Sequence, residues 1–220
     1  MADKTKSRLP INWFVVALIL SLYVLGYFLY PHLPEQVPSH WNMAGEVDGY
    51  SSRTFHILFF PSLILFLYLV MSFAPVLDPR PESYRKFQGV YEGFRYLMIG
   101  LLMLLYMATT LYALGYTFSI GKIVRFAIGL LLVFTGNYFG KIRHNYTFGI
   151  KTPWTLASEE VWNKTHRMSG PLWVVVGFIW MISVLIAEKL AFAISMGSFI
   201  TVSIYGCVYS YILFQRLKNQ

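Results

Sequence analysis

Long runs of apolar residues, separated by short polar segments, dominate this chain of 220 residues. A helix needs about 20 residues to cross the hydrocarbon core of a bilayer, and six of the runs approach or exceed that length. The sequence therefore predicts an all-α, polytopic membrane protein with about six transmembrane helices. The predicted spans are residues 12–30, 55–75, 95–116, 121–140, 171–187 and 190–213.

The first run follows Lys4, Lys6 and Arg8, as the apolar core of a secretory signal would. It is longer than such a core, and no cleavage site built of small residues follows it. We expect it to remain as a membrane anchor.

Composition agrees with the membrane class, because 56% of the residues are hydrophobic and only 13% are charged. The one cysteine, Cys207, excludes an intramolecular disulfide and the usual paired-cysteine metal sites. The net charge is +8, but the basic residues are scattered in small groups near the ends of the apolar runs. This placement favours a role in membrane orientation and predicts no direct binding of nucleic acid.

Lys and Arg are retained on the cytoplasmic side of membrane proteins, so their distribution predicts orientation. If the N-terminus is cytoplasmic, 14 of the 18 basic residues lie inside and four, Arg53, Lys122, Arg125 and Lys189, lie outside. The sequence therefore predicts that both termini are cytoplasmic. Arg125 is expected to extend toward the outer interface.

This topology divides the chain into two membrane regions of three spans each. Residues 1–116 form the first region, with an external loop at 31–54. Residues 117–220 form the second region, with a cytoplasmic loop at 141–170. A smaller cytoplasmic loop occupies residues 78–95. The halves show no sequence repeat, and a hidden one would have to be inverted.

No ionisable residue is evident in the middle of a span, which argues against proton-coupled transport. Arg95, Arg125 and Glu188 fall at predicted span ends. The deep polar residues are expected to hydrogen-bond backbone carbonyls or neighbouring helices. These residues are Thr109, Thr110, Thr135, Ser183 and Thr201.

The last span carries two rows of mostly small residues, which predict close helix packing within the chain or between copies. A homo-oligomer therefore stays open. The first row is Ser198, Val202, Gly206 and Ser210, and the second is Gly197 and Thr201.

The external loop is predicted to be ordered, because three prolines hold its start extended and Gly45 and Gly49 suit tight turns. His40, Glu46 and Asp48 lack the spacing of a calcium loop and have no second histidine nearby, so no metal site is predicted. The polar groups could cap turns, with Trp41 at the lipid interface, or the loop could bind a ligand. The candidate binding residues are His40, Trp41, Asn42, Gly45, Asp48 and Gly49.

The cytoplasmic loop is predicted to contain a short helix over residues 159–169. Ser158 is a typical N-cap and two glutamates occupy the first turn, whereas Gly170-Pro171 is expected to end the helix. Glu160 and Lys164 form a favourable i, i+4 pair. Such an amphipathic helix could lie on the membrane surface or carry function.

Catalysis has little support in this loop. His144 and His166 are candidate bases, and Ser158, Thr165 and Ser169 are candidate nucleophiles, but no motif joins a base to a nucleophile. We predict no catalytic residue and no cofactor, and we expect His166 to orient neighbours by hydrogen bonding. The candidate partner-binding residues are Asn137, Arg143, Asn145, Lys151, Thr152, Pro153, Trp154, Glu159, Glu160, Trp162, His166 and Arg167. The basic residues among them are expected to pair with the two glutamates and His166.

Two segments resemble a known family. "GNYFGKIRHNYTFGIKTPWTLASEEVWNKTHRMSG" is similar to the signature of the SdpI family, and "LPEQVPSHWNMAGEVDGYSSR" resembles the uncharacterised membrane domain that often precedes it. Together they cover the chain from about residue 12 to 190.

This resemblance implies a multi-pass protein of the bacterial cytoplasmic membrane that protects its producer from a secreted hydrophobic peptide toxin. It also implies a link to signalling, in which a small cytosolic repressor is held at the membrane. The alternatives are a membrane-tethered signalling protein without an immunity role, and a membrane enzyme or transporter.

Overall fold

The computed structural model describes residues 11–219, so the basic residues Lys4, Lys6 and Arg8 lie outside the described part of the chain. Six helices are long and apolar enough to cross a membrane, which confirms the predicted all-α, polytopic class. They are α1 (Trp13–Leu29), α2 (Arg53–Leu77), α4 (Gln88–Ala113), α5 (Ile120–Tyr138), α7 (Glu159–Ile182) and α8 (Glu188–Lys218).

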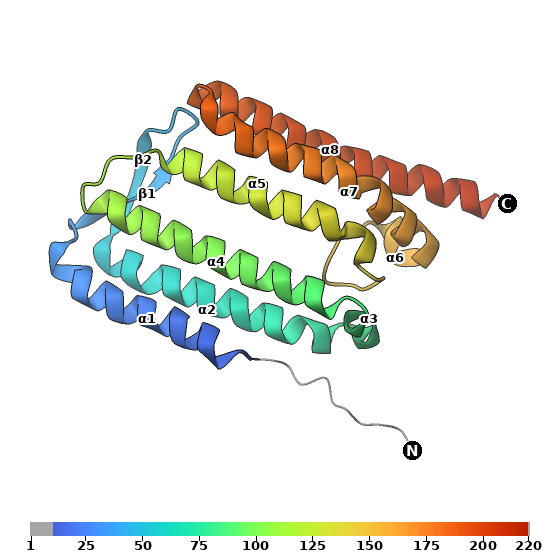
Figure 1. Ribbon diagram of the computed structural model, residues 1–220, viewed down its shortest axis with the longest axis horizontal. Helices are drawn as coiled ribbons and strands as arrows, with labels where there is room; N and C mark the ends of the chain where they lie inside the picture. Colours follow the sequence, from blue (N-terminus) through green and yellow to red (C-terminus); the bar gives the residue numbers. More distant parts are fainter. Residues whose placement is uncertain (1–10, 220) are drawn as a thin grey trace, which may run out of the picture.

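The six helices lie side by side in the order of the sequence, as Figure 1 shows. The hairpin of strands β1 (Gln36–Trp41) and β2 (Val47–Ser52) lies at one end of the bundle, which we call the hairpin end. At the opposite end, the loop end, lie the short helices α3 (Pro81–Arg85) and α6 (Pro153–Ala157) and the end of α8. Single 3₁₀ turns follow α1, α5 and α7, at Tyr30–His32, Phe139–Lys141 and Ser183–Leu185.

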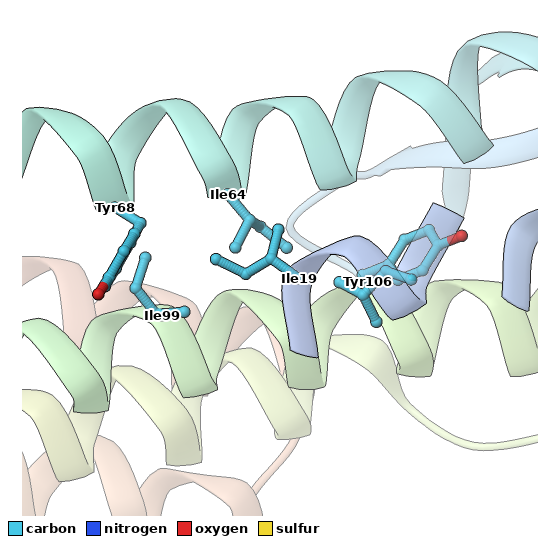
Figure 2. Packing of buried hydrophobic residues seen from close by; sticks show 6 residues of the cluster. Ile19, Ile64, Tyr68, Ile99 and Tyr106 are labelled. Carbon is cyan, nitrogen blue, oxygen red and sulfur yellow. The ribbon is translucent and has the colours of Figure 1, made fainter. Parts of the chain in front are cut away.

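Helices α1, α2 and α4 enclose the first hydrophobic core, shown in Figure 2. Isoleucine and tyrosine side chains from the three helices meet there. The Asn12 amide donates a hydrogen bond of 2.7 Å to the Tyr68 hydroxyl. The buried members are Ile19, Leu22, Ile64, Tyr68, Ile99 and Tyr106.

Helices α5, α7 and α8 form a second group, and α5 and α7 approach to backbone contact. A Cβ atom at Gly129 would lie 2.7 Å from the Gly177 carbonyl oxygen, and one at Gly136 would lie 2.7 Å from the Gly170 carbonyl oxygen. A Cβ atom at Gly177 would likewise lie 2.7 Å from the Gly129 carbonyl oxygen, and one at Gly170 would lie 2.7 Å from the Gly136 carbonyl oxygen. Only glycine allows helices to approach this closely, so these four residues determine how α5 and α7 pack.

The predicted break at Gly170-Pro171 is wrong. The short helix over 159–169 and the fifth span form one continuous helix, α7, which runs through Pro171. Proline removes one backbone donor and need not end a transmembrane helix whose neighbours hold both sides of the kink. Here Gly170, directly before the proline, is packed on Gly136 of α5.

The loop between α1 and α2 is ordered, as predicted, but the sequence did not indicate its antiparallel strands. Val37 and Leu33 are buried beneath the hairpin. Arg53 fixes its base, because the Arg53 amide donates to the Glu35 carbonyl and the guanidinium donates to the Leu33 carbonyl at 3.2 Å. Proline within β1 and a register shift beside it obscure the alternating pattern by which strands are recognised.

The prediction for the deep hydroxyl groups is confirmed. Each donates to a carbonyl three or four residues earlier in its own helix, for example Thr110 to Tyr106 at 2.7 Å and Thr135 to Leu131 at 2.7 Å. The others are Thr109, Ser183 and Thr201. The first row of small residues in α8 is also packed, because Val202, Gly206 and Ser210 are buried.

Two ionisable side chains of the long helices are buried, and one of them, Arg95, lies deeper than predicted. Helix α4 begins at Gln88, so Arg95 lies inside the helix and is buried, with its guanidinium donating to Ser72 at 3.1 Å. His56 of α2 is also buried, and its Nε2 lies 2.9 Å from the Thr110 hydroxyl. Hydropathy alone misplaced Arg95 because the polar first two turns of α4 lie outside its apolar run.

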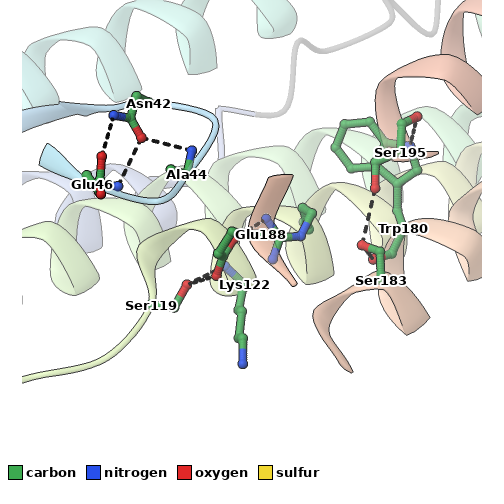
Figure 3. Close-up of polar contacts among 10 residues, drawn as sticks. Asn42, Ala44, Glu46, Ser119, Lys122, Trp180, Ser183, Glu188 and Ser195 are labelled. Carbon is green, nitrogen blue, oxygen red and sulfur yellow. Dashed lines mark hydrogen bonds and ion pairs between the residues drawn. The ribbon is translucent and has the colours of Figure 1, made fainter. Parts of the chain in front are cut away.

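Arg125 is buried and forms an ion pair near the hairpin end of the bundle, and its extension toward the outer interface stays a prediction. Its guanidinium donates to Glu188 at 2.7 Å, and the same carboxylate accepts from Ser119 at 2.7 Å (Figure 3). A Cβ atom at Gly45 would lie 3.3 Å from Glu188, so the hairpin tip contacts this group. The ion pair therefore joins α5, α8 and the hairpin at one end of the bundle.

Substitution of Gly177 by alanine should destabilise the protein by about 1–3 kcal/mol, because the new methyl group would overlap the Gly129 carbonyl. Gly197→Ala is the matched control, since a Cβ atom there meets nothing within 4 Å. Unfolding of the two variants in detergent measures the difference. Equal stability of the variants would contradict the close α5–α7 contact.

Candidate functional site

The segment from Ile142 to Thr152, which we call the site loop, folds around the buried amide of Asn145 at the loop end. The Asn145 side chain donates to the carbonyls of Arg143 at 2.8 Å and Phe148 at 2.9 Å. Its Oδ1 atom accepts from the amides of Thr147 at 3.0 Å and Phe148 at 2.7 Å. One side chain thus replaces the backbone pairing that regular structure would supply.

The segment between α2 and α4 holds the site loop from the other side. Asp78, directly after α2, accepts from the Tyr146 amide at 2.8 Å and from the Tyr84 hydroxyl at 3.3 Å. Tyr84 of α3 also hydrogen-bonds the Thr147 hydroxyl and lies 3.3 Å from Asn145 Oδ1. The two loops of this end are therefore one hydrogen-bonded unit, which connects the two halves of the bundle.

Three rings stack through the centre of this unit. Trp162 of α7 lies between His144, with ring centroids 5.1 Å apart, and His166, at 4.2 Å. The Trp162 indole donates to the Ile142 carbonyl at 3.0 Å. Trp162 and His166 are fully buried, so the first turns of α7 serve as the core on which the site loop is folded.

The hydrogen bonds of His166 determine its tautomer. The Ile150 amide donates to Nε2 at 2.9 Å, so Nδ1 carries the proton and donates to the Trp162 carbonyl at 2.8 Å. Both ring nitrogens are occupied, as expected for an orienting residue. Gly149 has φ 127° and its Cβ position lies 2.5 Å from His166 Nε2, so only glycine fits this close approach.

The charge state of His144 is set by its surroundings. Burial lowers the pKa of the His144 imidazole below its ordinary value of 6.5, and the positive charge of Arg80 lowers it further. Arg80 Nη1 donates to His144 Nδ1 at 2.7 Å, which requires that nitrogen to be unprotonated. Burial also raises the pKa of the Tyr84 phenol, which keeps it a neutral donor.

Helix α6 connects the site loop to α8. Thr152 caps α6 through a reciprocal pair of bonds with Thr155, and its hydroxyl lies 3.0 Å from Ser210 of α8. Trp154 packs on Tyr211 with ring centroids 5.0 Å apart. Thr152-Pro153 is therefore a helix start.

The predicted partner-binding residues divide into a buried and an exposed group, and Trp154 is half-buried between them. Asn145, Thr152, Trp162 and His166 are buried within the folded unit. The exposed group comprises Asn137, Arg143, Lys151, Pro153, Glu159, Glu160 and Arg167.

The expected mutual pairing of the charged residues is mostly wrong. Glu160 pairs with Lys164 at 2.6 Å, as predicted. Among the residues that the structure describes, no ion pair joins Arg143 or Arg167 to a glutamate. His166 is fully buried and hydrogen-bonds the Ile150 amide and the Trp162 carbonyl, so it pairs with none of these charged residues.

The predicted hairpin residues lie together at the opposite end. His40 donates to Asp48 at 2.5 Å on the exposed surface, and Trp41 packs edge-on against Tyr112 of α4.

Asn42 caps the turn by accepting from the amides of Ala44 and Glu46, as Figure 3 shows. The tight turn at Gly45 has φ 79°. A Cβ atom at Gly49 would lie only 2.9 Å from the Cβ atom of His40 on the opposite strand. Within residues 11–219, no group of His, Cys, Asp or Glu has the arrangement of a metal site.

Sequence reasoning did not single out Asp78, Arg80 or Tyr84, although they hold the site loop in place. One signal could have found them. The predicted topology puts residues 78–95 and 141–170 on the same side of the membrane, so polar residues in one loop are available to the other.

Together, the six helices and the folded loop end define a multi-pass helical membrane protein. Residues 141–212 match the SdpI/YfhL protein family, and residues 17–65 match a domain of unknown function, DUF1648. The immunity protein SdpI of Bacillus subtilis (strain 168) is 27% identical over 168 residues, which are 76% of this chain and 78% of that protein. These matches confirm the predicted resemblance and relate the chain to an immunity-protein family. No solved structure matches it.

The family segment 141–212 begins at the site loop and extends through α7 into α8. It therefore contains the three stacked rings and the contact between Thr152 and Ser210. The domain boundary predicted near residue 116 stays a prediction.

Asn145→Ala should destabilise the protein by about 2–4 kcal/mol, because it leaves the amides of Thr147 and Phe148 without their acceptor. Asn137→Ala is the control, since Asn137 is exposed at the end of α5. Thermal unfolding in detergent, with limited proteolysis of the site loop, provides the measurement. A loop that stays protected in Asn145→Ala would contradict this role.

Acidification should loosen the site loop through His144. Its pKa is lower in the folded state than in the unfolded chain, so the stability from neutral His144 is complete above about pH 6.5. That contribution is lost as the pH falls from 6.5 toward the lower folded pKa. Unfolding at several pH values should show a smaller acid loss in His144→Gln than in the wild type. His32→Gln, at an exposed histidine, should behave like the wild type.

Proposed function

We propose that this protein is an immunity protein of the bacterial cytoplasmic membrane, which protects the cell that makes it from a secreted, membrane-active peptide. Support comes first from the similarity to the immunity protein SdpI over 76% of the chain. In this proposal the loop end faces the cytosol and the hairpin end faces the medium, in agreement with the distribution of 14 basic residues against four.

The hairpin end has the surface that such a role needs. Met43 and Tyr50 of the hairpin are 61% and 59% exposed, and Phe55 and Phe59, stacked at 4.6 Å, are exposed just below on α2. An apolar peptide concentrated in the bilayer could contact the helix and the hairpin together. Capture by a few large side chains on a rigid support is the usual way in which binding energy is concentrated.

The rigidity of the support follows from the contacts of the hairpin. Trp41 packs on α4, and the tip at Gly45 contacts Glu188, which is paired with Arg125. A peptide that moves the hairpin would therefore disturb the start of α8. Since α8 reaches the loop end, where Ser210 contacts Thr152, this helix provides a physical connection between the ends.

A second candidate function is the recruitment of a cytosolic protein by the loop end, alone or together with immunity. The observation that favours it is the exposure of Arg143, Lys151 and Arg167 around a fully packed core. A simple connection between two helices needs no loop folded to this degree. A rigid surface with three cations suits an acidic partner.

Expression of the protein in a toxin-sensitive bacterium tests the first proposal. The wild type should preserve the membrane potential under peptide challenge, and Met43→Ser with Tyr50→Ser should lower the tolerated peptide concentration at least about tenfold. Glu160→Ala with Lys164→Ala, at the other end, is the control and should protect fully.

The same cells separate the two candidate functions. Arg143→Ala with Arg167→Ala should retain protection if immunity resides at the hairpin, while a recruited cytosolic protein should leave the membrane fraction. Absence of protection by the wild type against a panel of such peptides would contradict the immunity role. Unchanged retention of the soluble partner in the double variant would contradict docking at these arginines.

A further inference from the structure

A groove between the start of α4 and the end of α5 lies outside the site described above. It has a volume of about 410 Å³, and its wall is formed by Phe87, Val90 and Gly93 on one side and Phe134 and Tyr138 on the other. Gly93 opens its deep part, because a Cβ atom there would lie 2.8 Å from the Phe134 ring. The inner surface of the groove is thus aromatic and aliphatic.

The mouth of the groove is cationic. Arg85 and Lys86 line it, and both are exposed. Lys141 lies beside it, with its ammonium 4.9 Å from the centre of the Tyr138 ring. Helix α4 begins at Gln88, which lines the groove together with Gly89, and this helix start has no side-chain cap. No acidic residue lines the groove.

The depth of the groove in the bilayer follows from the length of α4. Its 26 residues extend about 39 Å, whereas the hydrocarbon core is about 30 Å thick. If the helix is centred, roughly three residues at each end lie at the level of the lipid headgroups. Arg85 and Lys86 therefore lie among phosphates, and Gly93 and Phe134 lie beside the upper acyl chains.

We propose that this groove binds an anionic phospholipid, with the phosphate between Arg85 and Lys86 and the first part of an acyl chain against Val90 and Phe134. A cationic mouth above an apolar wall matches a lipid with a charged headgroup, and basic pockets between transmembrane helices bind such headgroups. The inference is independent of the immunity role, since it requires only that the helices cross a bilayer.

The test uses purified full-length protein in detergent, titrated with phosphatidylglycerol or phosphatidylcholine and measured by native mass spectrometry. The wild type should bind phosphatidylglycerol more tightly. Arg85→Gln with Lys86→Gln should weaken this binding about 30-fold. This factor follows because each cation near the membrane surface contributes about 1 kcal/mol to the binding of an anionic lipid. Arg216→Gln with Lys218→Gln removes the same charge from exposed positions at the same end and should weaken it less than about threefold.

A photoreactive acyl chain gives a second measurement, which reports where on the protein the lipid lies. Phosphatidylglycerol carrying the group near its headgroup should label residues between 88 and 94 and between 134 and 138 in the wild type and in the Arg216/Lys218 control variant. Labelling should be lost in the Arg85/Lys86 variant, whose circular dichroism and phosphatidylcholine binding report whether it is folded.

Three outcomes would overturn the proposal. Equal weakening in both double variants would mean a general attraction between the protein surface and lipid. Displacement of the lipid by millimolar inorganic phosphate would mean a site for the free anion. Displacement by a synthetic polyglutamate peptide would assign the groove to an acidic protein segment.

Discussion

The backbone contact between α5 and α7 is the constraint on which the rest of the structure depends. Apolar side chains cannot drive helices together in lipid, because the lipid tails are equally apolar, so close packing must supply the attraction. Gly129 against Gly177 and Gly136 against Gly170 bring the two backbones together along most of their length. This contact includes Gly170, directly before Pro171, and α7 continues through that proline as one helix from Glu159 to Ile182.

The first turns of α7 then organise the loop end. Trp162 and His166 leave α7 on its buried face, and the site loop folds around them because Asn145 and Gly149 satisfy its backbone. Asp78 and Tyr84 attach this unit to the first three helices. The histidines His144 and His166 are buried in this unit, whereas Arg143, Lys151 and Arg167 are exposed on its surface.

The two ends of the bundle differ in the way they join the halves. The loop end uses a network of neutral and charged hydrogen bonds, whereas the hairpin end uses the Arg125–Glu188 pair and the contact of Gly45 with Glu188. An ion pair with little solvent access has a high cost when one partner is removed. The contact of Gly45 with Glu188 therefore couples the segment that matches DUF1648 to the segment that matches the SdpI/YfhL family. The loop end instead joins residues 78–84 to the second of these segments.

The sequence by itself determined the six spans, the hydroxyl groups that bond within helices, the Ser158 cap and the Glu160–Lys164 pair, because these depend on local composition and on residues three or four apart. It also indicated the family, through a long segment with many polar residues. The tertiary structure alone decided that Arg95 and His56 are buried, that Arg125 meets Glu188 and that Asp78 meets Tyr146, since each depends on residues distant in sequence. The tertiary structure also decided that α7 continues through Pro171, because its packing on α5 is not visible in the local sequence pattern.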